Sequence, residues 1–391
     1  MSHLIVFSAV ALLLVLLCAS ELEGGEHRIR VDAGKVDRQD ALVGVDVPGA
    51  SGEHAKREWI KVTVKAGGSA TYTLPHNAAA PGKTSASARE DGPDILRLRS
   101  GDRDLLVYQG GAGTLPPGYD ESFRRGGYIQ SVFTPSGTLV TDDYPPGHKH
   151  HHGVWSPWTK TEFENRQPDF WNMGDRTGTV KAVSARVTET GPVVAGFEAR
   201  HQMVDLSAKP TPKPAIDERW SVLAYTSGIG SGESARPCNV FDLVITQNCA
   251  TDSPLILPEY HYGGLGFRGH RQWDGAGKCR FLTSEGKTGV DGNATRARWC
   301  YVGGDVDGKP AGIAILCHPD NFRFPQPVRL HPHEPFLCFA PSQLGEWRIE
   351  PGKPYVARYR FVVADGEPDP KEIDRLWRDY ADPVSVLLVS Q

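Results

Sequence analysis

Short apolar runs, several with alternating polar residues, follow one another along most of the chain. Residues 59–65 and 355–363 alternate clearly, as strands do when one face is buried and the other is wet. Gly, Pro, Asp and Asn separate the runs, and stretches with a period of 3.6 residues are nearly absent. We therefore predict an all-β fold, a large antiparallel β-sandwich of supersandwich type. The expected strands cover residues 59–65, 95–99, 104–109, 128–133, 180–188, 193–204, 216–225, 238–246, 279–283, 298–302, 312–317, 335–340 and 355–363.

One helix is predicted near the C-terminus, over residues 369–381. Asp369 provides a capping side chain and Pro370 stands at the first helical position, where its missing N–H costs nothing. The helical period then places apolar side chains on one face, which we expect to pack against the sandwich. These side chains are Ile373, Leu376, Trp377 and Tyr380.

The N-terminal residues differ from the rest of the chain. An apolar run over residues 4–17 is followed by Cys18, Ala19 and Ser20. This pattern is typical of a secretory signal peptide and is too short for a comfortable membrane span. We predict an exported protein, periplasmic or extracellular, with no membrane segment beyond the signal. The expected divisions are a signal peptide (1–20), a small N-terminal β region (21–93), the main sandwich (94–368), and a helix with a tail (369–391).

The composition is that of an ordinary globular protein. Hydrophobic residues make up 39% of the chain and charged residues 23%, and the formal net charge is −4. A net negative charge gives no sign of the basic surface that binds nucleic acid. The expected partner is a small molecule or an oligosaccharide. The cysteines beyond Cys18 form no Cys-x-x-Cys pair, and most stand in apolar runs. Buried thiols are therefore favoured over disulfides.

Four histidines and two carboxylates stand together in residues 141–155. Imidazole transfers protons near neutral pH and is the commonest metal ligand, so two functions are open for this run. His150 and His151, with Asp143 as carboxylate partner, would suit acid/base catalysis, and Asp142 would contact substrate. An extended backbone would instead turn alternate side chains to one face and offer a site for a divalent metal. Its ligands would be His148, His150 and His152.

A second group of chemical side chains lies in residues 258–270. Glu259 and His261 would share one face of a strand, as a carboxylate and a proton carrier. Tyr260, Tyr262 and Arg268 offer flat surfaces, hydroxyl groups and a guanidinium fork, which suit sugar hydroxyls and carboxylates. The alternative is a Gly-rich hairpin with an ordinary ion pair.

Weaker candidates lie elsewhere in the chain. Arg298, His318 and Asn321 are possible substrate contacts, although residues 317–321 also read as a simple turn. Trp171, in residues 170–175, could form the floor of a sugar site or belong to the core. The segment 331–334 has the composition of a metal site, but its prolines indicate a loop.

Several enzyme classes lack their usual motifs. The chain has no Gly-x-Ser-x-Gly elbow, no phosphate-binding loop of the Gly-x-x-x-x-Gly-Lys-Ser/Thr type, no His-Glu-x-x-His and no dinucleotide fingerprint. The first cupin motif also fails, because Asp142 stands where that motif has Gly, six positions before His148. The sequence therefore lacks support for a serine hydrolase, a nucleoside triphosphatase, a zincin or a nicotinamide enzyme.

The segments 139–155, 259–268, 298–300 and 312–321 together resemble an exported bacterial family. The family is common in Planctomycetes and is catalogued as "methane oxygenase PmoA" or as a domain of unknown function. The resemblance covers roughly residues 95–365 and implies an exported β-protein. The layout is also similar, more weakly, to the galactose-mutarotase type of β-supersandwich, in which a His and a Glu act on a sugar ring. The membrane methane monooxygenase subunit that the label evokes is a bundle of transmembrane helices. This chain has a mean hydropathy of −0.37, and its only long apolar run is residues 4–17.

Three functional hypotheses follow. The first is an exported carbohydrate-active enzyme that uses His/carboxylate acid/base chemistry for hydrolysis, elimination or epimerisation. The second is a mononuclear metal-dependent oxygenase or hydrolase at the histidine run. The third is a non-catalytic glycan-binding or envelope protein. No cofactor is certain beyond the possible divalent metal.

Overall fold

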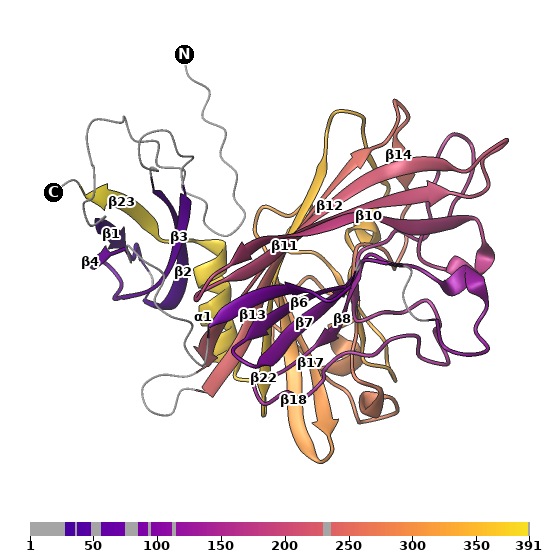
Figure 1. Ribbon diagram of the computed structural model, residues 1–391. Helices are drawn as coiled ribbons and strands as arrows, with labels where there is room; N and C mark the ends of the chain where they lie inside the picture. The colour runs from indigo at the N-terminus through magenta and orange to yellow at the C-terminus, as the bar shows by residue number, and fades with distance from the viewer. Residues whose placement is uncertain are drawn as a thin grey trace.

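The computed structural model describes residues 28–35, 37–47, 56–74, 85–92, 95–111, 115–229 and 236–389. The predicted signal peptide, residues 1–20, lies outside these ranges. Within them, no helix is long and apolar enough to cross a membrane. Antiparallel strands of the described residues form two large sheets and three small ones, so the predicted all-β sandwich is confirmed (Figure 1).

The first large sheet, which we call the long sheet, contains eight antiparallel strands. In spatial order they are β10 (Gly178–Thr190), β11 (Ala195–Asp205), β12 (Lys213–Ile229), β13 (Arg236–Cys249), β22 (Tyr355–Asp365), β18 (Lys309–Cys317), β17 (Trp299–Val306) and β16 (Arg280–Thr283). Strand β22 joins two hairpin systems, because it pairs with β13 on one side and β18 on the other.

The second large sheet, the site sheet, also has eight antiparallel strands. They are β19 (Val328–Leu330), β20 (Phe336–Phe339), β15 (Leu265–Arg268), β9 (Val154–Trp155), β8 (Tyr128–Val132), β7 (Arg103–Gln109), β6 (Ile95–Ser100) and β5 (Ala86–Glu90). A two-stranded sheet, β14 (Leu255–Leu257) with β21 (Trp347–Ile349), adds to this body. Short 3-10 turns lie in the connections: η1 (Glu121–Phe123), η2 (Met173–Asp175), η4 (Arg271–Trp273), η5 (Gly289–Gly292) and η6 (Pro341–Leu344).

The main hydrophobic core fills the space between the two large sheets. Side chains alternate along each strand, so every strand sends one set into this core and the other set outward. On β20, Leu337 belongs to the main core while Phe336 belongs to a separate aromatic cluster on the outer face. On β18, Ile315 points into the core and Leu316 points to the cluster under the helix. The outer faces of the two sheets therefore carry different structures.

Helix α1 (Pro370–Ala381) covers the outer face of the long sheet. The Asp369 side chain accepts hydrogen bonds from the N–H groups of Lys371 and Glu372, as expected for a cap. Ile373 and Leu376 are buried, and they pack with residues of β17, β18 and β22. The predicted helix, its cap and its apolar face are confirmed.

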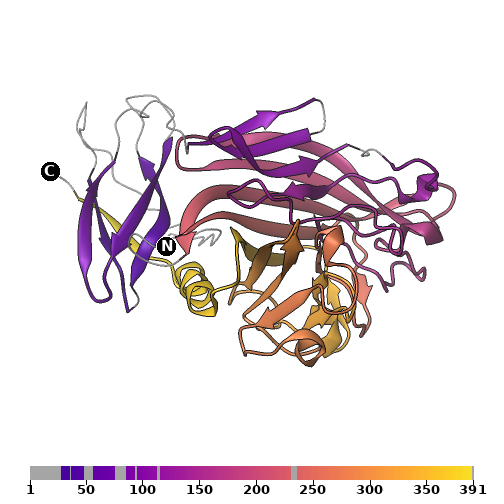
Figure 2. The same cartoon turned by 90° about the horizontal axis from the view of Figure 1, so that it is seen from below.

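A small β unit stands beside the sandwich (Figure 2). It consists of β1 (Arg28–Asp32), β4 (Ser69–Thr73) and β23 (Ser385–Val389) in one sheet, and of β2 (Arg38–Val47) with β3 (Lys56–Val64) in another. Its core joins side chains from both ends of the chain, including Ile29, Val62 and Val386. The C-terminal strand pairs with β1 along its whole length, so residues 385–389 belong to the same unit as the N-terminal strands.

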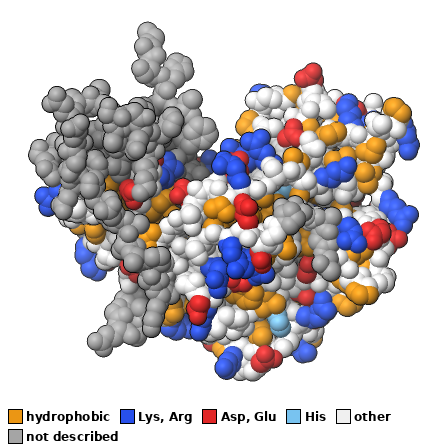
Figure 3. Space-filling view, in the orientation of Figure 1, with side chains coloured by type: hydrophobic (Ala, Val, Ile, Leu, Met, Phe, Trp, Pro, Cys, Tyr) orange, Lys and Arg blue, Asp and Glu red, His pale blue; other side chains and the backbone are white. Residues whose placement is uncertain are grey.

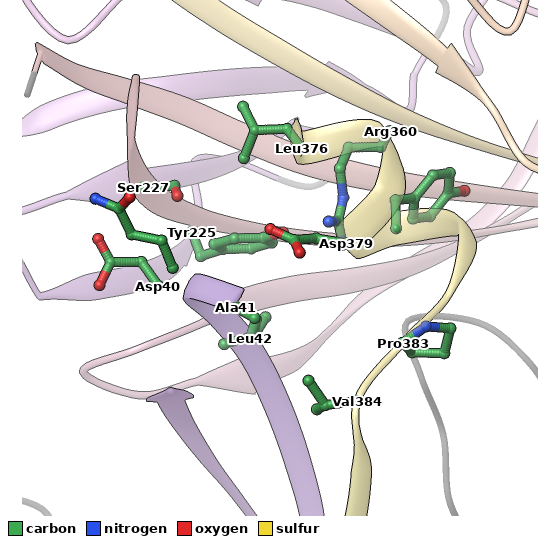
Figure 4. A pocket seen from close by; sticks show the side chains of 12 residues that line it. Asp40, Ala41, Leu42, Tyr225, Ser227, Arg360, Leu376, Asp379, Pro383 and Val384 are labelled. Atoms are coloured by element: carbon green, nitrogen blue, oxygen red, sulfur yellow. The ribbon is translucent and has the colours of Figure 1, made fainter. Parts of the chain in front are cut away.

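A buried ion pair fixes the small unit to α1, and a second buried pair lies within the long sheet. Arg38 Nη1 lies 3.1 Å from Asp379 Oδ1 on α1, and both side chains are almost fully buried. Arg360 on β22 forms a bidentate pair with Asp242, at 2.7 and 2.9 Å. A cavity of about 20 Å³ remains beside them, lined in part by Tyr225 (Figure 4). It has room for a single water molecule, so the joint is nearly close-packed.

All thirteen predicted strand regions are strands in the structure. Ten further strands of the described residues were not predicted: β1, β2, β4, β5, β9, β14, β15, β19, β21 and β23. The six cysteines in the described ranges are free thiols, and burial raises the pKa of Cys238, Cys317 and Cys338 to about 12. They behave as small core residues, as the apolar sequence context indicated.

Candidate metal centre

The histidine run forms a tight loop on the outer side of the site sheet. His148 N donates to Pro145 O at 3.0 Å and His151 N donates to His148 O at 2.9 Å, which makes two turns in succession. A bond from Tyr144 N to His151 O, 3.1 Å long, closes the loop. The extended backbone predicted for this run is wrong, because turns place His148 beside His151 instead of aligning alternate residues.

The loop is tied to β15 and β9 at its base. Asp142 N donates to Arg268 O at 3.1 Å, and Arg268 N donates to Gly153 O at 2.9 Å. A Cβ atom on Gly153 would lie 2.4 Å from Gln130 Oε1 and 2.5 Å from Ile129 O. The close approach requires glycine at this position, and it fixes where the run enters the sheet.

Three rings form a stack above β20. The His148 and His151 rings lie 4.6 Å apart with planes 6° apart, and Phe336 stacks on the other side of His151 at 4.7 Å. His150 meets both histidines edge-on, at centroid distances of 5.8 and 4.7 Å. The apolar surface of Phe336 thus holds His151 in place and turns the histidine pair toward the loop that follows β19.

That loop provides Glu334. His148 Nδ1 lies 3.0 Å from Glu334 Oε2, without the angles of a hydrogen bond. The buried Arg268 donates to the same oxygen at 2.6 Å and to Asp274 Oδ1 at 2.5 Å. Burial alone would raise the pKa of Glu334, but His148 and the Arg268 guanidinium lower it to about 2. Glu334 is therefore a carboxylate at neutral pH, held in one orientation by Arg268.

His148, His151 and Glu334 have the arrangement of metal ligands. One ligand atom from each lies within 4.8 Å of the other two. The Nδ1 atoms of both histidines are buried and have no hydrogen-bond partner among the described residues. Ligands at about 2.1 Å from one tetrahedral ion lie about 3.4 Å from each other, so small ring rotations would bring all three into place. A buried His151 nitrogen without a hydrogen-bond partner, next to the contact of 3.0 Å between His148 and Glu334, is an arrangement that a bound ion would complete.

His150 and His151 are neutral at neutral pH because their pKa values are lowered. Burial, with the nearby His148 and His152, lowers the pKa of His150 to about 4. Burial also lowers the pKa of His151 well below its ordinary value, helped by its histidine neighbours and Arg268. Neutral imidazole is the form that binds metal ions and accepts protons.

His152 belongs to a separate pair behind the loop. Its Nδ1 lies 2.6 Å from Asp143 Oδ1, and Tyr128 donates to the other oxygen of Asp143 at 3.1 Å. The Tyr128 ring also stacks on the imidazole at 4.2 Å. The His152 ring is fully enclosed. Asp143 and His152 thus support the loop, while half-buried His148 and buried His151 lie beside Glu334.

Asp142, the predicted substrate contact next to Asp143, is engaged by Arg271. The guanidinium of Arg271 donates to both carboxylate oxygens, at 3.0 and 2.9 Å. This pair joins the histidine loop to η4. The described contacts of Asp142 are therefore those of a residue that positions the loop.

The second predicted cluster lies in a loop between β14 and β15, so the shared strand face expected for Glu259 and His261 is wrong. Both residues are exposed. Tyr260 and Tyr262 each contact the His261 ring at a centroid distance of 4.3 Å. Trp171 links this loop to the histidines, since its ring lies 5.9 Å from Tyr262 and 6.1 Å from His151. Tyr260, His261, Tyr262 and Trp171, which we call the aromatic strip, thus lead from the surface to His151.

Arg298, His318 and Asn321 lie on the other side of the sandwich. Arg298 stacks over Trp377 of α1 at 4.9 Å, and His318 contacts Tyr380 of α1 at 4.8 Å. Asn321 bonds to the N–H and C=O groups of Arg358, at 2.7 and 2.8 Å. These contacts belong to the packing of α1 and the long sheet, and the structure does not bring the three residues to the histidine loop.

A buried polar chain inside the sandwich had no signal in the sequence. His201 lies 2.6 Å from Tyr108 Oη and 2.8 Å from Glu218 Oε2. Glu218 accepts from Gln247 at 2.7 Å, and Gln247 accepts from Trp158 at 2.7 Å. The members come from both large sheets and lie far apart in sequence, and the separate strand patterns do not show that they meet.

Glu334 belongs to the candidate site, although the sequence around the histidine run did not indicate it. The composition of residues 331–334 did resemble a metal site, but only the strand order brings that loop beside the run. Its neighbours in space, β15 and β20, are paired with each other, and β15 also pairs with β9, which follows the histidine run.

A family model, the Family of unknown function (DUF6807), matches residues 96–378. The chain belongs to this family. The DUF6807 match includes the histidine run, Arg268 and Glu334, and it leaves out β1 to β4 and β23 of the small unit. No curated protein matches the chain.

Proposed function

We propose that this DUF6807 protein is a metal-dependent enzyme that acts on a carbohydrate. His148, His151 and Glu334 would hold one divalent ion. The observation that carries the proposal is the grouping of His148, His151 and Glu334, one ligand atom of each lying within 4.8 Å of the other two, together with a buried His151 Nδ1 that has no hydrogen-bond partner in the described structure. Two histidines and one carboxylate are the ligand set of many hydrolytic zinc sites and of non-heme iron oxygenases.

The surrounding residues fit such a centre. Ligand carboxylates are usually held by a further hydrogen bond, and Arg268 provides one to Glu334. His151 is held by its stack on Phe336. A divalent ion here would act as a Lewis acid and lower the pKa of a bound water molecule. His150, edge-on to both ligand histidines and neutral at pH 7, is placed to accept a proton.

The carbohydrate part of the proposal is supported by the aromatic strip. Exposed His261 and half-buried Tyr260 present ring faces at the surface, and the Tyr262 ring lies next to them with Arg329 at 5.3 Å. Sugar rings bind to such faces through their C–H groups, and the buried Trp171 connects these rings to His151. Export follows from residues 4–17 as a further part of this proposal, since polysaccharides are met outside the cell.

Elemental analysis of tag-free protein tests the metal directly. We expect close to one equivalent of zinc, iron or manganese, and its loss in the double variant His148→Ala/His151→Ala. His333→Ala, an exposed histidine next to Glu334, is the matched control and should keep the metal. Less than about a tenth of an equivalent, with no uptake on reconstitution, would show that His148, Glu334 and Arg268 form only an ion-pair network.

Turnover is tested separately with a panel of sugars and oligosaccharides followed by NMR. A second candidate function, acid/base chemistry without a metal, is favoured by the half-buried His150, whose pKa burial lowers to about 4, so that it can accept a proton at neutral pH. Turnover in metal-free protein that is lost in folded His150→Gln would support it. Tight binding of sugars without turnover would instead indicate a glycan-binding protein.

A further inference from the structure

An open groove lies where β21 meets the start of β22, outside the histidine site. Its volume is about 550 Å³, within the range of small-ligand sites. Phe322 and Trp347 line it, with ring centroids 4.8 Å apart and planes 37° apart. Phe322 is 40% exposed, which is unusual for a large apolar side chain in this protein. Arg323 lies over the Phe322 ring at 4.9 Å and Tyr355 contacts the Trp347 ring at 5.0 Å, so the groove offers a ligand the exposed part of Phe322, supported by Trp347.

The charges of the groove are mainly positive. Arg348, Lys353 and Arg358 line it, and Asp320 is the one carboxylate among its described lining residues. Lys353 also pairs with Glu350 at 2.7 Å, just outside the lining. The whole chain has a net charge of −4, and positive and negative side chains are intermixed on the face shown in Figure 3. An excess of cations in one groove is therefore a local feature, distinct from the overall charge.

We propose that this groove binds an acidic oligosaccharide. One sugar ring lies against Phe322 and Trp347, and its carboxylate or sulfate pairs with Arg348, which is exposed at the edge of the groove. A guanidinium matches the geometry of both anions, and aromatic faces bind the apolar side of a sugar ring. The combination recognises charge and ring together, which neither a neutral glycan nor a simple anion would satisfy.

The backbone around the groove argues against a peptide in the same place. An extended peptide would need a free strand edge with which to pair. Strand β21 has only three residues and pairs with β14 on one side, and Pro354, which lacks an N–H group, lies among the lining residues, so the groove offers a peptide at most a short edge. Recognition in this groove rests on side chains, as expected for a sugar.

The groove adjoins the aromatic strip through Ser342. The Ser342 carbonyl accepts from Tyr260 N at 3.2 Å, and its hydroxyl accepts from Trp347 Nε1 at 3.0 Å. A polymeric ligand could therefore contact both surfaces. The proposal for the groove does not depend on a metal at His148, so each can fail without the other.

Isothermal titration of the full chain with trigalacturonate, a chondroitin sulfate disaccharide, neutral galactotriose and a triglutamate peptide tests the groove. We expect binding of at least one acidic sugar, with galactotriose and triglutamate about tenfold weaker or undetectable. Phe322→Ala and Arg348→Ala should each weaken that binding by about tenfold, and added salt should weaken it further. Arg186→Ala, an exposed arginine on β10, is the matched control and should change nothing.

The thermal midpoint of each variant shows whether it is folded. Phe322 and Arg348 are exposed, so we expect both variants to melt like the parent protein. Three results would overturn the proposal. They are no binding of either acidic sugar, equal binding of triglutamate, and binding that survives both substitutions in folded protein.

Discussion

His148 and His151 stack face to face at 4.6 Å, and the Nδ1 atom of each is buried with no hydrogen-bond partner in the described chain. Burial lowers the pKa of His151 well below its ordinary value, because a proton there would place a charge in a site with little water. Protonation of His151 therefore opposes the proposed metal binding at the same place.

Acid should destabilise the protein below neutral pH because of the histidine loop. The pKa of His150 falls from 6.5 in the unfolded chain to about 4 in the fold, mainly through burial. Between these values the unfolded chain binds more protons, so the free energy of unfolding decreases as the pH falls from about 6.5 to about 4. One such proton changes it by about 1.4 kcal/mol per pH unit.

Urea unfolding at several pH values measures this effect. His150→Gln should show a smaller decrease over the same interval, since that side chain does not titrate. Glu334, whose pKa falls from 4.5 to about 2, loses its stabilising contribution below about pH 4.5 and therefore overlaps only the acid end of this interval. Equal slopes in the parent and the variant would show that His150 does not contribute.

Asp143 and Asp142 provide a matched pair of substitutions. Asp143→Asn weakens a bond to a fully enclosed imidazole and one to Tyr128, and we expect a loss of about 2 kcal/mol in the free energy of unfolding. Asp142→Asn affects a pair with the half-exposed Arg271 and should cost less than about 1 kcal/mol. Chemical denaturation of both variants decides, and a reversed order would mean that the loop is held mainly by η4.

Glu218 should be one of the most sensitive positions in the core. Glu218→Ala removes the acceptor of both His201 and Gln247 inside the sandwich, and we expect a loss of about 3 kcal/mol. Asp217→Ala, its exposed neighbour on β12, should change stability by less than about 0.5 kcal/mol. Thermal unfolding compares the two. Similar midpoints would show that water replaces the lost carboxylate.

Arg38 should control how firmly the small β unit is attached. Arg38→Met leaves Asp379 buried with Arg375 as its remaining partner, so the joint should weaken by about 2 kcal/mol. We expect faster proteolytic cleavage in the small unit and little change in the sandwich, followed by mass spectrometry of the fragments. Lys65→Met, which affects an exposed pair with Asp37, is the control. Equal cleavage of both variants would contradict the prediction.

The sequence predicted the strands that alternate or form long apolar runs, because a sheet with one buried face imposes that pattern locally. Strands β9, β14 and β21 have two or three residues each, too few to show a period. Helix α1 was predictable from its cap and its apolar face. Sheet order was not, since it depends on pairing between distant segments.

The same distinction holds for the candidate site. The histidine run was visible as composition, but the structure groups His148 with His151 and Glu334, because Pro145 and the turns that follow replace the assumed extended backbone. Glu334 reaches the run only through the pairing of β9, β15 and β20. Arg298 and His318 were also candidate substrate contacts in the sequence, yet they pack against α1.

The pairing of β23 with β1 has a consequence for synthesis of the chain. Strand β1 is among the first described segments to leave the ribosome, and its neighbour β23 is the last. The long sheet also needs a late segment, since β22 at residues 355–365 pairs with both β13 and β18. A released chain truncated before residue 385 would therefore retain every strand of the two large sheets but leave one edge of β1 unpaired and open to association.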